Sequence, residues 1–300
     1  SVWPDDPESI MCLQEFMAYL LTADTSLQKG LMIVGPKRGG KGTIGRVIEQ
    51  LVGAGNTANP TLASLGQPFG LQCLIGKALA LMSDVRLGKQ ADIAAIAENV
   101  LRIIGEDTVS VPRKFQPDYT AKLMCRIVVL TNEVPLFRDA AAALPSRFLI
   151  LRTTRSFYGQ EDHELGARLT AELPAIFSWA LQGLRRLRER GRFVQPASAA
   201  QHIRLMEDLA SPIGAFLREQ CVVEPGGEVP VQKLYAAWVQ WCHDHDRERH
   251  GNEQTFGRDI AAAAPAVDSY RPRINGVRVR CYRGIRLRTP NDPEAEGDDE

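Results

Sequence analysis

The chain has 300 residues, 44% of them apolar, and its 36 Lys and Arg residues balance 36 Asp and Glu residues. This size and composition predict one sizeable core with a second, smaller domain. No apolar run approaches the roughly 18 residues of a membrane span, and the first residues do not resemble a signal peptide. A membrane or secreted protein is therefore not expected, and a cytoplasmic location is. The six cysteines are scattered without paired spacing, which predicts reduced thiols.

The charge is unevenly distributed along the chain. Residues 291–300 hold six acids and no base, so the rest of the chain carries a formal charge of +6. Seven arginines and no acid lie between Arg271 and Arg288. A basic segment of this kind predicts a nucleic-acid surface, with an ordinary solvated arginine-rich hairpin as the alternative. The acidic residues 289–300 are expected to be disordered.

Apolar patterns in the first half of the chain predict an α/β core. Residues 8–23 have helical spacing, and a second helix is expected from about 43 to 51, after a glycine-rich turn. Short continuous apolar runs are typical of strands that are covered on both faces, as in parallel sheets. Four such runs are present, at residues 31–34, 78–82, 127–130 and 148–151.

After residue 157 the pattern becomes helical. Residues 163–190 predict two helices, because Pro174 would break one helix but suits the first turn of another. Residues 191–212 are expected to form a connector. The Asn275-Gly276 pair between extended runs is a strong hairpin signal. It follows three predicted helices, in an order typical of a winged helix, at residues 213–220, 231–243 and 253–263.

The strongest chemical signal is the glycine-rich turn GPKRGGKGT at residues 35–43, between a predicted strand and a predicted helix. In such a turn backbone N–H groups close around phosphates, a lysine reaches the β and γ oxygens, and the helix N-terminus favours negative charge. The turn therefore predicts a phosphate-binding loop for ATP. Its expected contacts are Gly35, Pro36, Gly39, Gly40, Lys41, Gly42 and Thr43.

The loop departs from the usual pattern at one position. Gly42 follows Lys41 where a Ser or Thr normally holds Mg²⁺. Thr43 is expected to bind a phosphate oxygen or to share the metal with Asp84. The same Gly-Lys-Gly-Thr run is found in adenylate kinases, so a small-molecule kinase is an alternative function.

Polar residues follow two of the predicted strands. Asp84 comes 43 residues after Lys41, where the Mg²⁺-binding acid of such ATPases lies, although aspartates are also common in turns. Asn132 follows the 127–130 run and could hold the attacking water against the γ-phosphate, as a sensor residue does.

Arg147 directly precedes the predicted strand at residues 148–151. It could reach the nucleotide of a neighbouring subunit and stabilise the transition state as an arginine finger. Arg152 and Arg155 are alternatives for the same role, and an ordinary surface arginine is the plainer interpretation.

Residues 105–123 alternate as two strands with a polar turn. In a motor ring such a hairpin can project into the pore and contact DNA phosphates through Arg113, Lys114 and Lys122. The alternative is an edge hairpin with solvated charges.

With these signals in order, residues 8–245 resemble the superfamily 3 helicases, and the likeness is greatest to the C-terminal helicase part of phage/plasmid primases. It rests on the stretches TADTS, GPKRGGKGT, ALMSDVRL, GEDTVSVPRKF, VVLTNEVP, LPSRF, ELPAIFSWALQGLRRL and LYAAWVQWC. The resemblance implies an AAA+-like ATPase core, a homo-oligomeric ring that is a hexamer, and DNA translocation in phage or plasmid-type replication. It also implies ATP and Mg²⁺ as cofactors.

Roles carry over from the family at matching positions. The resemblance implies that Lys41 and Thr43 bind nucleotide, Asp84 holds Mg²⁺, and Asn132 is the sensor. It also implies that Arg147 is the finger and that Lys114 contacts DNA.

The expected domains are an N-terminal helical segment (1–29), a P-loop ATPase core (30–157), a helical lid or connector (158–210), a winged-helix-like domain (211–288) and an acidic tail (289–300). Single-stranded DNA is expected in the pore. Duplex DNA on the basic wing at Arg273, Arg278 and Arg280 is one expected role of the last domain, and docking of partner proteins is the alternative.

Further partners are a primase or other replication proteins, with no membrane. Family members often carry an upstream primase domain, so we expect a fragment or a standalone helicase, from a bacterial cell, phage or mobile element. A third candidate function is an ATP-gated origin-binding loader that does not unwind DNA.

Overall fold

The computed structural model describes residues 2–83, 85, 91–135, 137, 143–247, 250–274 and 276–292. The chain forms two compact units, the first ending at Met206 and the second beginning at Glu207. Among the described residues, no helix has both the length and the apolar character that a bilayer crossing requires.

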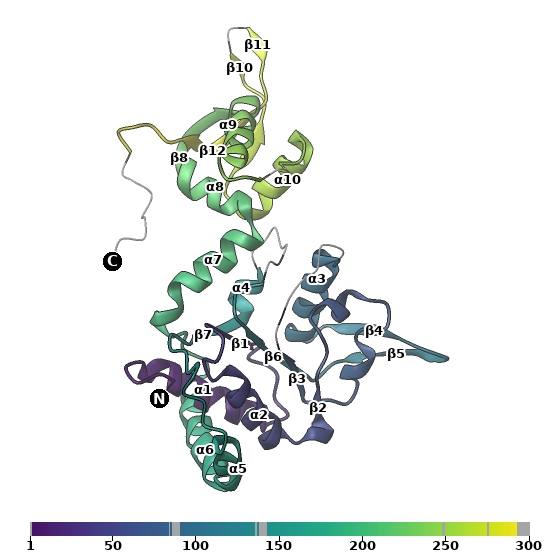
Figure 1. Cartoon of the computed structure of the whole chain (residues 1–300). Helices are drawn as coiled ribbons and strands as arrows, with labels where there is room; N and C mark the ends of the chain where they lie inside the picture. Colours follow the sequence, from purple (N-terminus) through teal and green to yellow (C-terminus); the bar gives the residue numbers. More distant parts are fainter. Residues whose placement is uncertain are drawn as a thin grey trace. The chain divides into compact units, whose positions relative to one another are not determined.

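A parallel sheet forms the centre of the first unit (Figure 1). Its strand order is β2-β3-β6-β1-β7, and every neighbouring pair is parallel. The four predicted strands are all present within one or two residues of their expected bounds, which confirms the α/β core. The strands are β1 (Gly30–Val34), β2 (Thr57–Ala58), β3 (Leu79–Ser83), β6 (Arg126–Thr131) and β7 (Phe148–Arg152).

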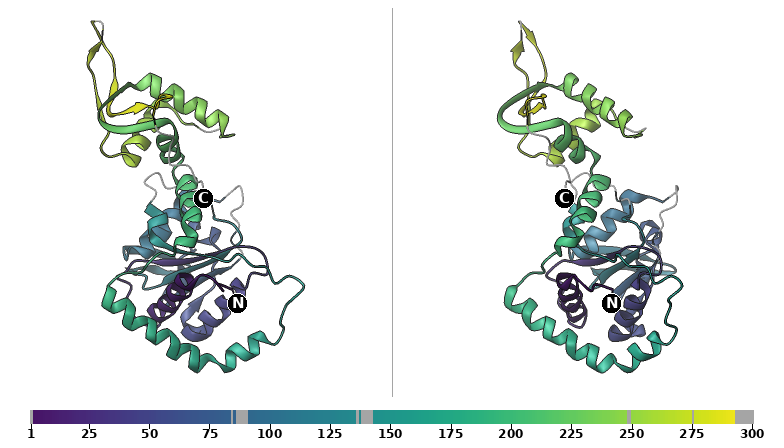
Figure 2. Two further views of the ribbon diagram at one scale, coloured as in Figure 1. Left: turned by 90° about the vertical axis from the view of Figure 1, so that its left-hand side faces the viewer. Right: turned by 60° about the vertical axis from the view of Figure 1, so that its left-hand side comes forward.

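Helices cover both faces of this sheet. Alternate strand residues such as Leu31, Ile33 and Leu130 join a buried cluster with α1 (Pro7–Leu20) and α2 (Lys41–Val52). Helices α5 (Leu165–Ala171) and α6 (Leu173–Arg190) pack across α1 and α2, and α3 (Ile93–Ile104) lies on the opposite side of the sheet (Figure 2). Burial of both faces explains why the strands are continuous apolar runs rather than alternating ones.

Helices α5 and α6 confirm the expected break within residues 163–190. Pro174 occupies the first turn of α6, where a missing N–H costs no helical hydrogen bond. Gly191 ends α6 with φ 71°, a left-handed conformation that glycine adopts without strain. Helix α1 joins α6 through the buried carboxylate of Glu15, which pairs with Arg186 at 2.6 Å and also with Arg190.

A two-stranded antiparallel hairpin, β4 (Thr108–Arg113) with β5 (Gln116–Lys122), projects from the first unit (Figure 1). Its tip is Lys114-Phe115, where Phe115 has φ 59° and its side chain is 96% exposed. The sequence prediction of a hairpin in this segment is confirmed.

The segment expected to form a connector, residues 191–212, contains the eleven-residue helix α7 (Ala200–Ala210). Its apolar residues Met206 and Ala210 are buried, so the segment has the amphipathic pattern of a packed helix. The polar residues that precede it obscured that pattern in the sequence.

The second unit contains the three predicted helices, α8 (Pro212–Gln220), α9 (Val231–Asp244) and α10 (Glu253–Ala263). A strand that the sequence did not predict, β8 (Cys221–Pro230), lies between α8 and α9. It pairs with β12 (Cys281–Leu287), which also pairs with β9 (Asp268–Tyr270). The expected hairpin is present as β10 (Arg273–Ile274) and β11 (Val277–Arg278).

Strand β8 was missed because its centre reads as a turn. Its sequence Glu224-Pro225-Gly226-Gly227 would normally end a strand. In the structure the register between β8 and β12 shifts between Arg283 and Ile285, and a Cβ at Gly227 would lie 2.9 Å from the Ile285 carbonyl carbon. The glycine is therefore required by a close approach of two backbones within the sheet.

Removing the buried carboxylate between α1 and α6 should destabilise the first unit. Glu15→Gln removes the negative charge that Arg186 and Arg190 share and leaves a single amide oxygen to accept from them, and we expect the free energy of unfolding to fall by about 3 kcal/mol in urea denaturation. The matched control is Asp162→Asn, which breaks an exposed pair with Arg168. A smaller loss is expected there, because water screens that pair. Equal losses in the two variants would contradict the expectation.

Candidate nucleotide-binding site

The glycine-rich loop follows β1 at the carboxyl edge of the sheet. Gly35 has φ 153°, and a Cβ there would lie 2.1 Å from both the carbonyl oxygen and Oγ1 of Thr153. A Cβ at Gly39 would lie 2.9 Å from the Pro36 carbonyl oxygen. The two glycines are required because the loop backbone runs against the residue that follows β7.

The loop turns directly into α2. Gly40 is the N-cap with φ 84°, and the first helical hydrogen bond runs from the Ile44 N–H to the Gly40 carbonyl. The helix begins at Lys41, about two residues earlier than the sequence predicted. The N–H groups of its first turn therefore point toward the loop, where they and the helix dipole favour an anion.

Lys41 connects the loop to the neighbouring strand. Its ammonium donates to the carbonyl oxygens of Gly35 and Pro36, both at 2.7 Å, and to Oδ1 of Asn132 at 3.0 Å. The side chain is only 8% exposed. These three oxygen acceptors hold the ammonium group of Lys41 in position, and the oxygens of a bound phosphate could replace them.

Strand register explains why Asn132 reaches Lys41. Val34 pairs with Thr131, so the loop and Asn132 leave adjacent parallel strands at the same level. Strand β3 ends one place further along the same edge, where Ser83 pairs with Leu130. Asp84, the predicted Mg²⁺ ligand, lies outside the described residues.

Thr43 lies in the first turn of α2, half-buried, and its hydroxyl accepts a hydrogen bond from Arg46 Nη2 at 3.2 Å. Among the residues that the structure describes, no group of three or more His, Cys, Asp and Glu side chains could hold a metal ion. The Thr43 hydroxyl is one oxygen atom that the described loop could offer to a magnesium–nucleotide complex. Gly42, beside it, has no side chain to contribute.

Arg147 lies at the amino ends of the parallel strands, whereas the loop lies at their carboxyl ends. It is the last residue of α4 (Ala143–Arg147) and precedes Phe148, which pairs with Gly30 at the amino end of β1. The five residues of β1 separate it from the loop of its own chain, a span of roughly 16 Å. Its guanidinium donates from Nη1 to Oε1 of Gln28.

The two alternative arginines, Arg152 and Arg155, lie near the carboxyl ends of the strands, on the same side as the loop. Arg152 pairs with Val34 across β7 and β1. The backbone carbonyl of Arg155 would lie 3.1 Å from a Cβ at Gly39, and its guanidinium lies 5.5 Å from the centre of the Phe157 ring. The fold therefore separates the three candidates into two near the chain's own loop and one far from it.

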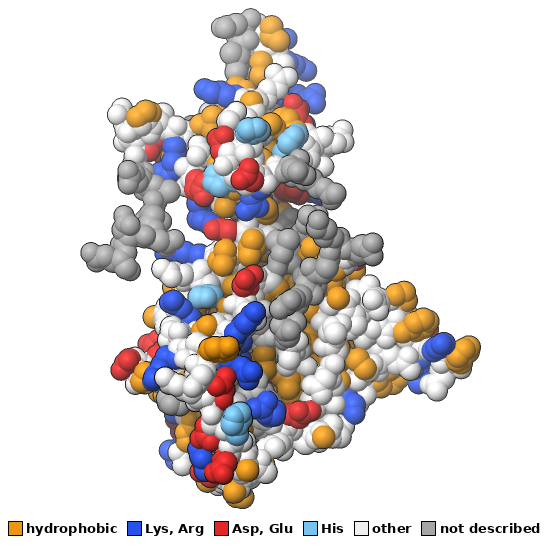
Figure 3. All heavy atoms as spheres, viewed as in Figure 1, with side chains coloured by type: hydrophobic (Ala, Val, Ile, Leu, Met, Phe, Trp, Pro, Cys, Tyr) orange, Lys and Arg blue, Asp and Glu red, His pale blue; other side chains and the backbone are white. Residues whose placement is uncertain are grey.

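Basic and apolar side chains meet at the tip of the β4–β5 hairpin (Figure 3). The Lys114 ammonium lies 5.3 Å from the centre of the Phe115 ring, and the Arg113 guanidinium lies 5.7 Å from that of Tyr119. Lys122 is exposed at the far end of β5. The three predicted basic residues thus lie along one hairpin, and the exposed Phe115 was not predicted.

The basic wing in the second unit places two arginines opposite each other. Arg273 pairs with Arg278 across β10 and β11, and both are exposed. Like charges in directly opposite positions repel. No carboxylate in the described part of the chain forms an ion pair with either. Arg280 instead donates to the Ser269 hydroxyl at 3.1 Å.

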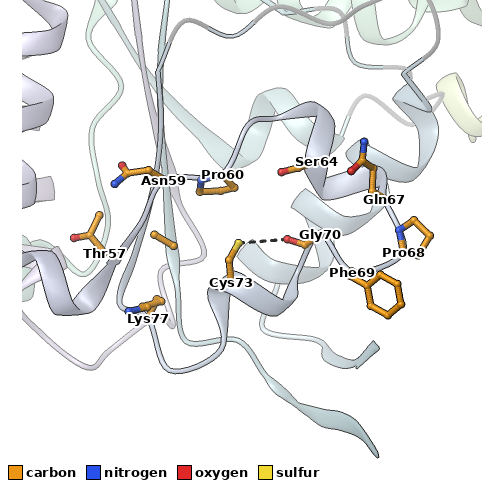
Figure 4. A pocket seen from close by; sticks show the side chains of 11 residues that line it. Thr57, Asn59, Pro60, Ser64, Gln67, Pro68, Phe69, Gly70, Cys73 and Lys77 are labelled. Atoms are coloured by element: carbon orange, nitrogen blue, oxygen red, sulfur yellow. Dashed lines mark hydrogen bonds between the residues drawn. The ribbon is translucent and has the colours of Figure 1, made fainter. Parts of the chain in front are cut away.

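A hollow of about 650 Å³ lies beside the edge strand β2, away from the loop (Figure 4). Thr57, Asn59 and Lys77 line one end, Phe69 lies at the other, and Cys73 lies between them (Figure 4). The Cys73 thiol donates to the Gly70 carbonyl at 3.4 Å. None of the predicted site residues lines this hollow.

Sequence reasoning missed two sets of residues around the loop. Thr153 N–H donates to the Val34 carbonyl at 2.7 Å, which holds the residue against Gly35. Its position directly after a buried strand is the same signal that identified Asn132. Trp3 is buried and donates to the Arg152 carbonyl at 2.6 Å, and Val2 would contact a Cβ at Gly40. No local pattern marks these two residues.

A protein family described as "Family of unknown function (DUF5906)" matches residues 33–147, which span the loop, Asn132 and Arg147. Comparison with curated proteins finds no match. Among solved structures, an apo form of the NrS-1 C-terminal region is similar with a TM-score of 0.58 and 13% identity, over 93% of this chain and 72% of that chain. Another apo structure of that region has a TM-score of 0.56 and 11% identity, over 95% and 73%.

A structure of JCV Helicase with a bound acetamide compound has a TM-score of 0.36 and 16% identity, over 68% of this chain and 61% of that one. The comparisons and the strand pairing therefore show a mixed α/β fold with a parallel central sheet, shared with the NrS-1 C-terminal region.

A side chain at Gly35 should destroy the loop. Gly35→Ala places a methyl group against the Thr153 backbone, so we expect ATP affinity to fall more than tenfold in equilibrium titration with a fluorescent ATP analogue. Gly55→Ala is the control, since a Cβ there meets nothing within 4 Å. Binding that survives in Gly35→Ala would show that the loop does not hold the nucleotide.

Proposed function

We propose that this chain is an ATP-driven DNA motor of the superfamily 3 type, which hydrolyses ATP between neighbouring copies in a ring. The observation that carries the proposal is the pairing of two features at opposite ends of β1. A lysine in a glycine-rich loop is bonded to a strand-end asparagine at one end, and a half-buried arginine lies at the other.

The loop end has the groups that phosphate binding needs. Phosphate oxygens would replace the carbonyl and amide oxygens that Lys41 now contacts, and the first turn of α2 would donate N–H groups. Asn132 would then be released to orient a water molecule. Bound Mg²⁺ would neutralise charge on the phosphates, held by Asp84 and the Thr43 hydroxyl.

The arginine end supports a shared site. Arg147 lies roughly 16 Å from its own loop by the length of β1, so it would serve the nucleotide of a neighbouring copy. Arg152 and Arg155 would act at the chain's own loop instead. A head-to-tail contact of this kind generates a closed ring when the rotation between copies closes.

DNA contact is assigned to two basic surfaces. The hairpin tip combines Lys114 with an exposed aromatic ring, a combination suited to single strands, because cations contact the backbone and rings stack on bases. The β10–β11 wing would contact duplex phosphates, since its opposed arginines are relieved of repulsion by an anion.

Two other candidate functions would use the same loop. A small-molecule kinase needs a cavity for its phosphate acceptor beside the loop. The hollow beside β2 is not lined by any residue of the loop. An ATP-gated loader would share the loop, the arginine and the DNA surfaces. It differs by binding DNA and hydrolysing ATP without separating strands.

Steady-state ATP hydrolysis with and without single-stranded DNA tests the proposal. We expect DNA to stimulate turnover, Lys41→Ala to abolish it, and Arg147→Ala to lower kcat by about 10³-fold. Turnover that ignores DNA, together with an active Arg147→Ala variant, would end the motor proposal. DNA-stimulated turnover without unwinding of a forked duplex would favour the loader.

A separate prediction concerns the β10–β11 wing. Replacing both Arg273 and Arg278 by alanine should weaken duplex binding for all sequences and reduce the slope of log K against log salt by about 2, from the loss of two phosphate contacts. Fluorescence anisotropy across salt concentrations measures this slope. Arg168→Ala, which removes an arginine already paired with Asp162, is the control. An unchanged slope in the double variant would remove the wing from the DNA surface.

A further inference from the structure

The amide of Gln28 joins two parts of the first unit that the proposed motor uses. Its Oε1 accepts from Arg147 Nη1, and its Nε2 donates to the carbonyl of Gly105 at 3.0 Å. Arginine can only donate and a carbonyl can only accept, so both partners fix the same orientation of the amide. Gln28 therefore holds Arg147 and the end of α3 in one geometry.

The backbone at this position is itself constrained. Gln28 has φ 50°, a left-handed conformation that non-glycine residues rarely adopt, and its N–H donates to the Thr25 carbonyl at 2.9 Å. Residues that are held in such conformations at a cost are concentrated at functional sites. The strained backbone aims the amide at Arg147 from the residue just before Lys29 and β1.

Gly105 lies at the base of the β4–β5 hairpin. The next residue, Glu106, has φ 62° and accepts from the Thr25 hydroxyl through Oε1. Strand β4 begins two residues later, at Thr108. Thr25 and Gln28 thus contact the hairpin base at two adjacent positions, and a shift of the hairpin would move the Gly105 carbonyl that orients the amide.

The acceptor for Arg147 is neutral. No carboxylate pairs with Arg147 in the described parts of the chain. The ammonium group of the nearby Lys29 donates a hydrogen bond to the Ser146 carbonyl. Burial and the charge of Arg147 together lower the pKa of Lys29. A neutral holder leaves the full positive charge of the guanidinium for an anion, whereas a glutamate would neutralise it.

We infer that Gln28 is a positioning residue for Arg147, which aligns the guanidinium for the neighbouring copy's phosphates and ties that alignment to the base of the DNA hairpin. This inference rests on the proposed function. Arg147 touches the nucleotide of the neighbour, and Gln28 acts only through Arg147. A shift of the hairpin base would then also shift the guanidinium of Arg147.

Gln28→Gly is the first test variant. Glycine removes the amide and also tolerates φ 50°, so folding is preserved while the holder is lost. We expect kcat of DNA-stimulated ATP hydrolysis to fall at least tenfold, the KM for ATP to change less than about twofold, and the melting temperature not to fall. Asp246→Gly, another left-handed residue at φ 52°, is the matched control and should turn over like wild type.

Mixing inactive variants separates action on a neighbour from action on the chain's own site. In a random equal mixture with Lys41→Ala, about a quarter of interfaces combine an intact loop with an intact Gln28 and Arg147. Gln28→Gly and Lys41→Ala should therefore together regain about a quarter of wild-type turnover. Arg147→Ala mixed with Lys41→Ala should behave the same way.

The outcomes distinguish the inference from the proposed function. If the Arg147→Ala mixture regains turnover and the Gln28→Gly mixture does not, the positioning role is wrong and the shared site stands. If neither mixture regains turnover, the shared site fails and the inference fails with it. A Gln28→Gly variant with wild-type kcat also overturns the inference.

Gln28→Glu tests the link to the hairpin. The carboxylate still accepts from Arg147 but cannot donate to the Gly105 carbonyl. Because it also neutralises the guanidinium and so lowers turnover with and without DNA alike, the readout is the ratio of the two rates. We expect the ratio of turnover with DNA to turnover without DNA to fall toward one. An unchanged ratio would overturn the link to the hairpin base.

Discussion

The register of β1 between its two parallel neighbours determines where every candidate residue lies. Val34 is opposite Thr131 on one side and Arg152 on the other, and Gly30 is opposite Phe148. The carboxyl end of β1 therefore brings the loop beside Asn132, while the amino end sets Gln28 beside Arg147. A slip of one residue would turn each apolar side chain to the opposite face, and burial on both faces makes any new pairing costly.

Non-glycine residues with a left-handed backbone lie where the sheet connects to the candidate loop and to the hairpin. Of the five non-glycine residues with positive φ in the described part of the chain, four belong to the first unit: Gln28, Arg38, Glu106 and Phe115. They lie before β1, in the loop, at the hairpin base and at the hairpin tip. Each costs about 1–3 kcal/mol. The core must supply that stability, and the α1–α6 contact around Glu15 is one of its sources.

The sequence was sufficient for the features that depend on local chemistry. Four apolar runs predicted four strands, and the glycine-rich turn predicted a loop whose glycines are required by contacts with Thr153. The polar residue after a strand identified Asn132. Asp84 rests on the same reasoning, and because it lies outside the described residues its role stays a prediction.

What the sequence could not supply depends on contacts between distant segments. Gln28 has no local motif, and only the meeting of β1, α3 and α4 gives its amide two partners. Strand β8 was hidden because Pro225 and two glycines read as a turn, yet pairing with β12 extends it over ten residues. Trp3 contacts Arg152 across 149 positions of sequence. Local patterns carry no information about such pairs.

The cysteines of this chain differ sharply in their environment. Five are buried, and burial raises the pKa of Cys12 and Cys125 to about 12, so these thiols stay protonated and shielded. Cys73 alone is exposed, at the hollow beside β2. Partial burial raises its pKa as well, so its reaction with maleimide will quicken as the pH rises. Cys73 thus offers a single exposed attachment point for a fluorophore among the described residues, beside the edge strand β2 and in a hollow that takes no residue from the loop.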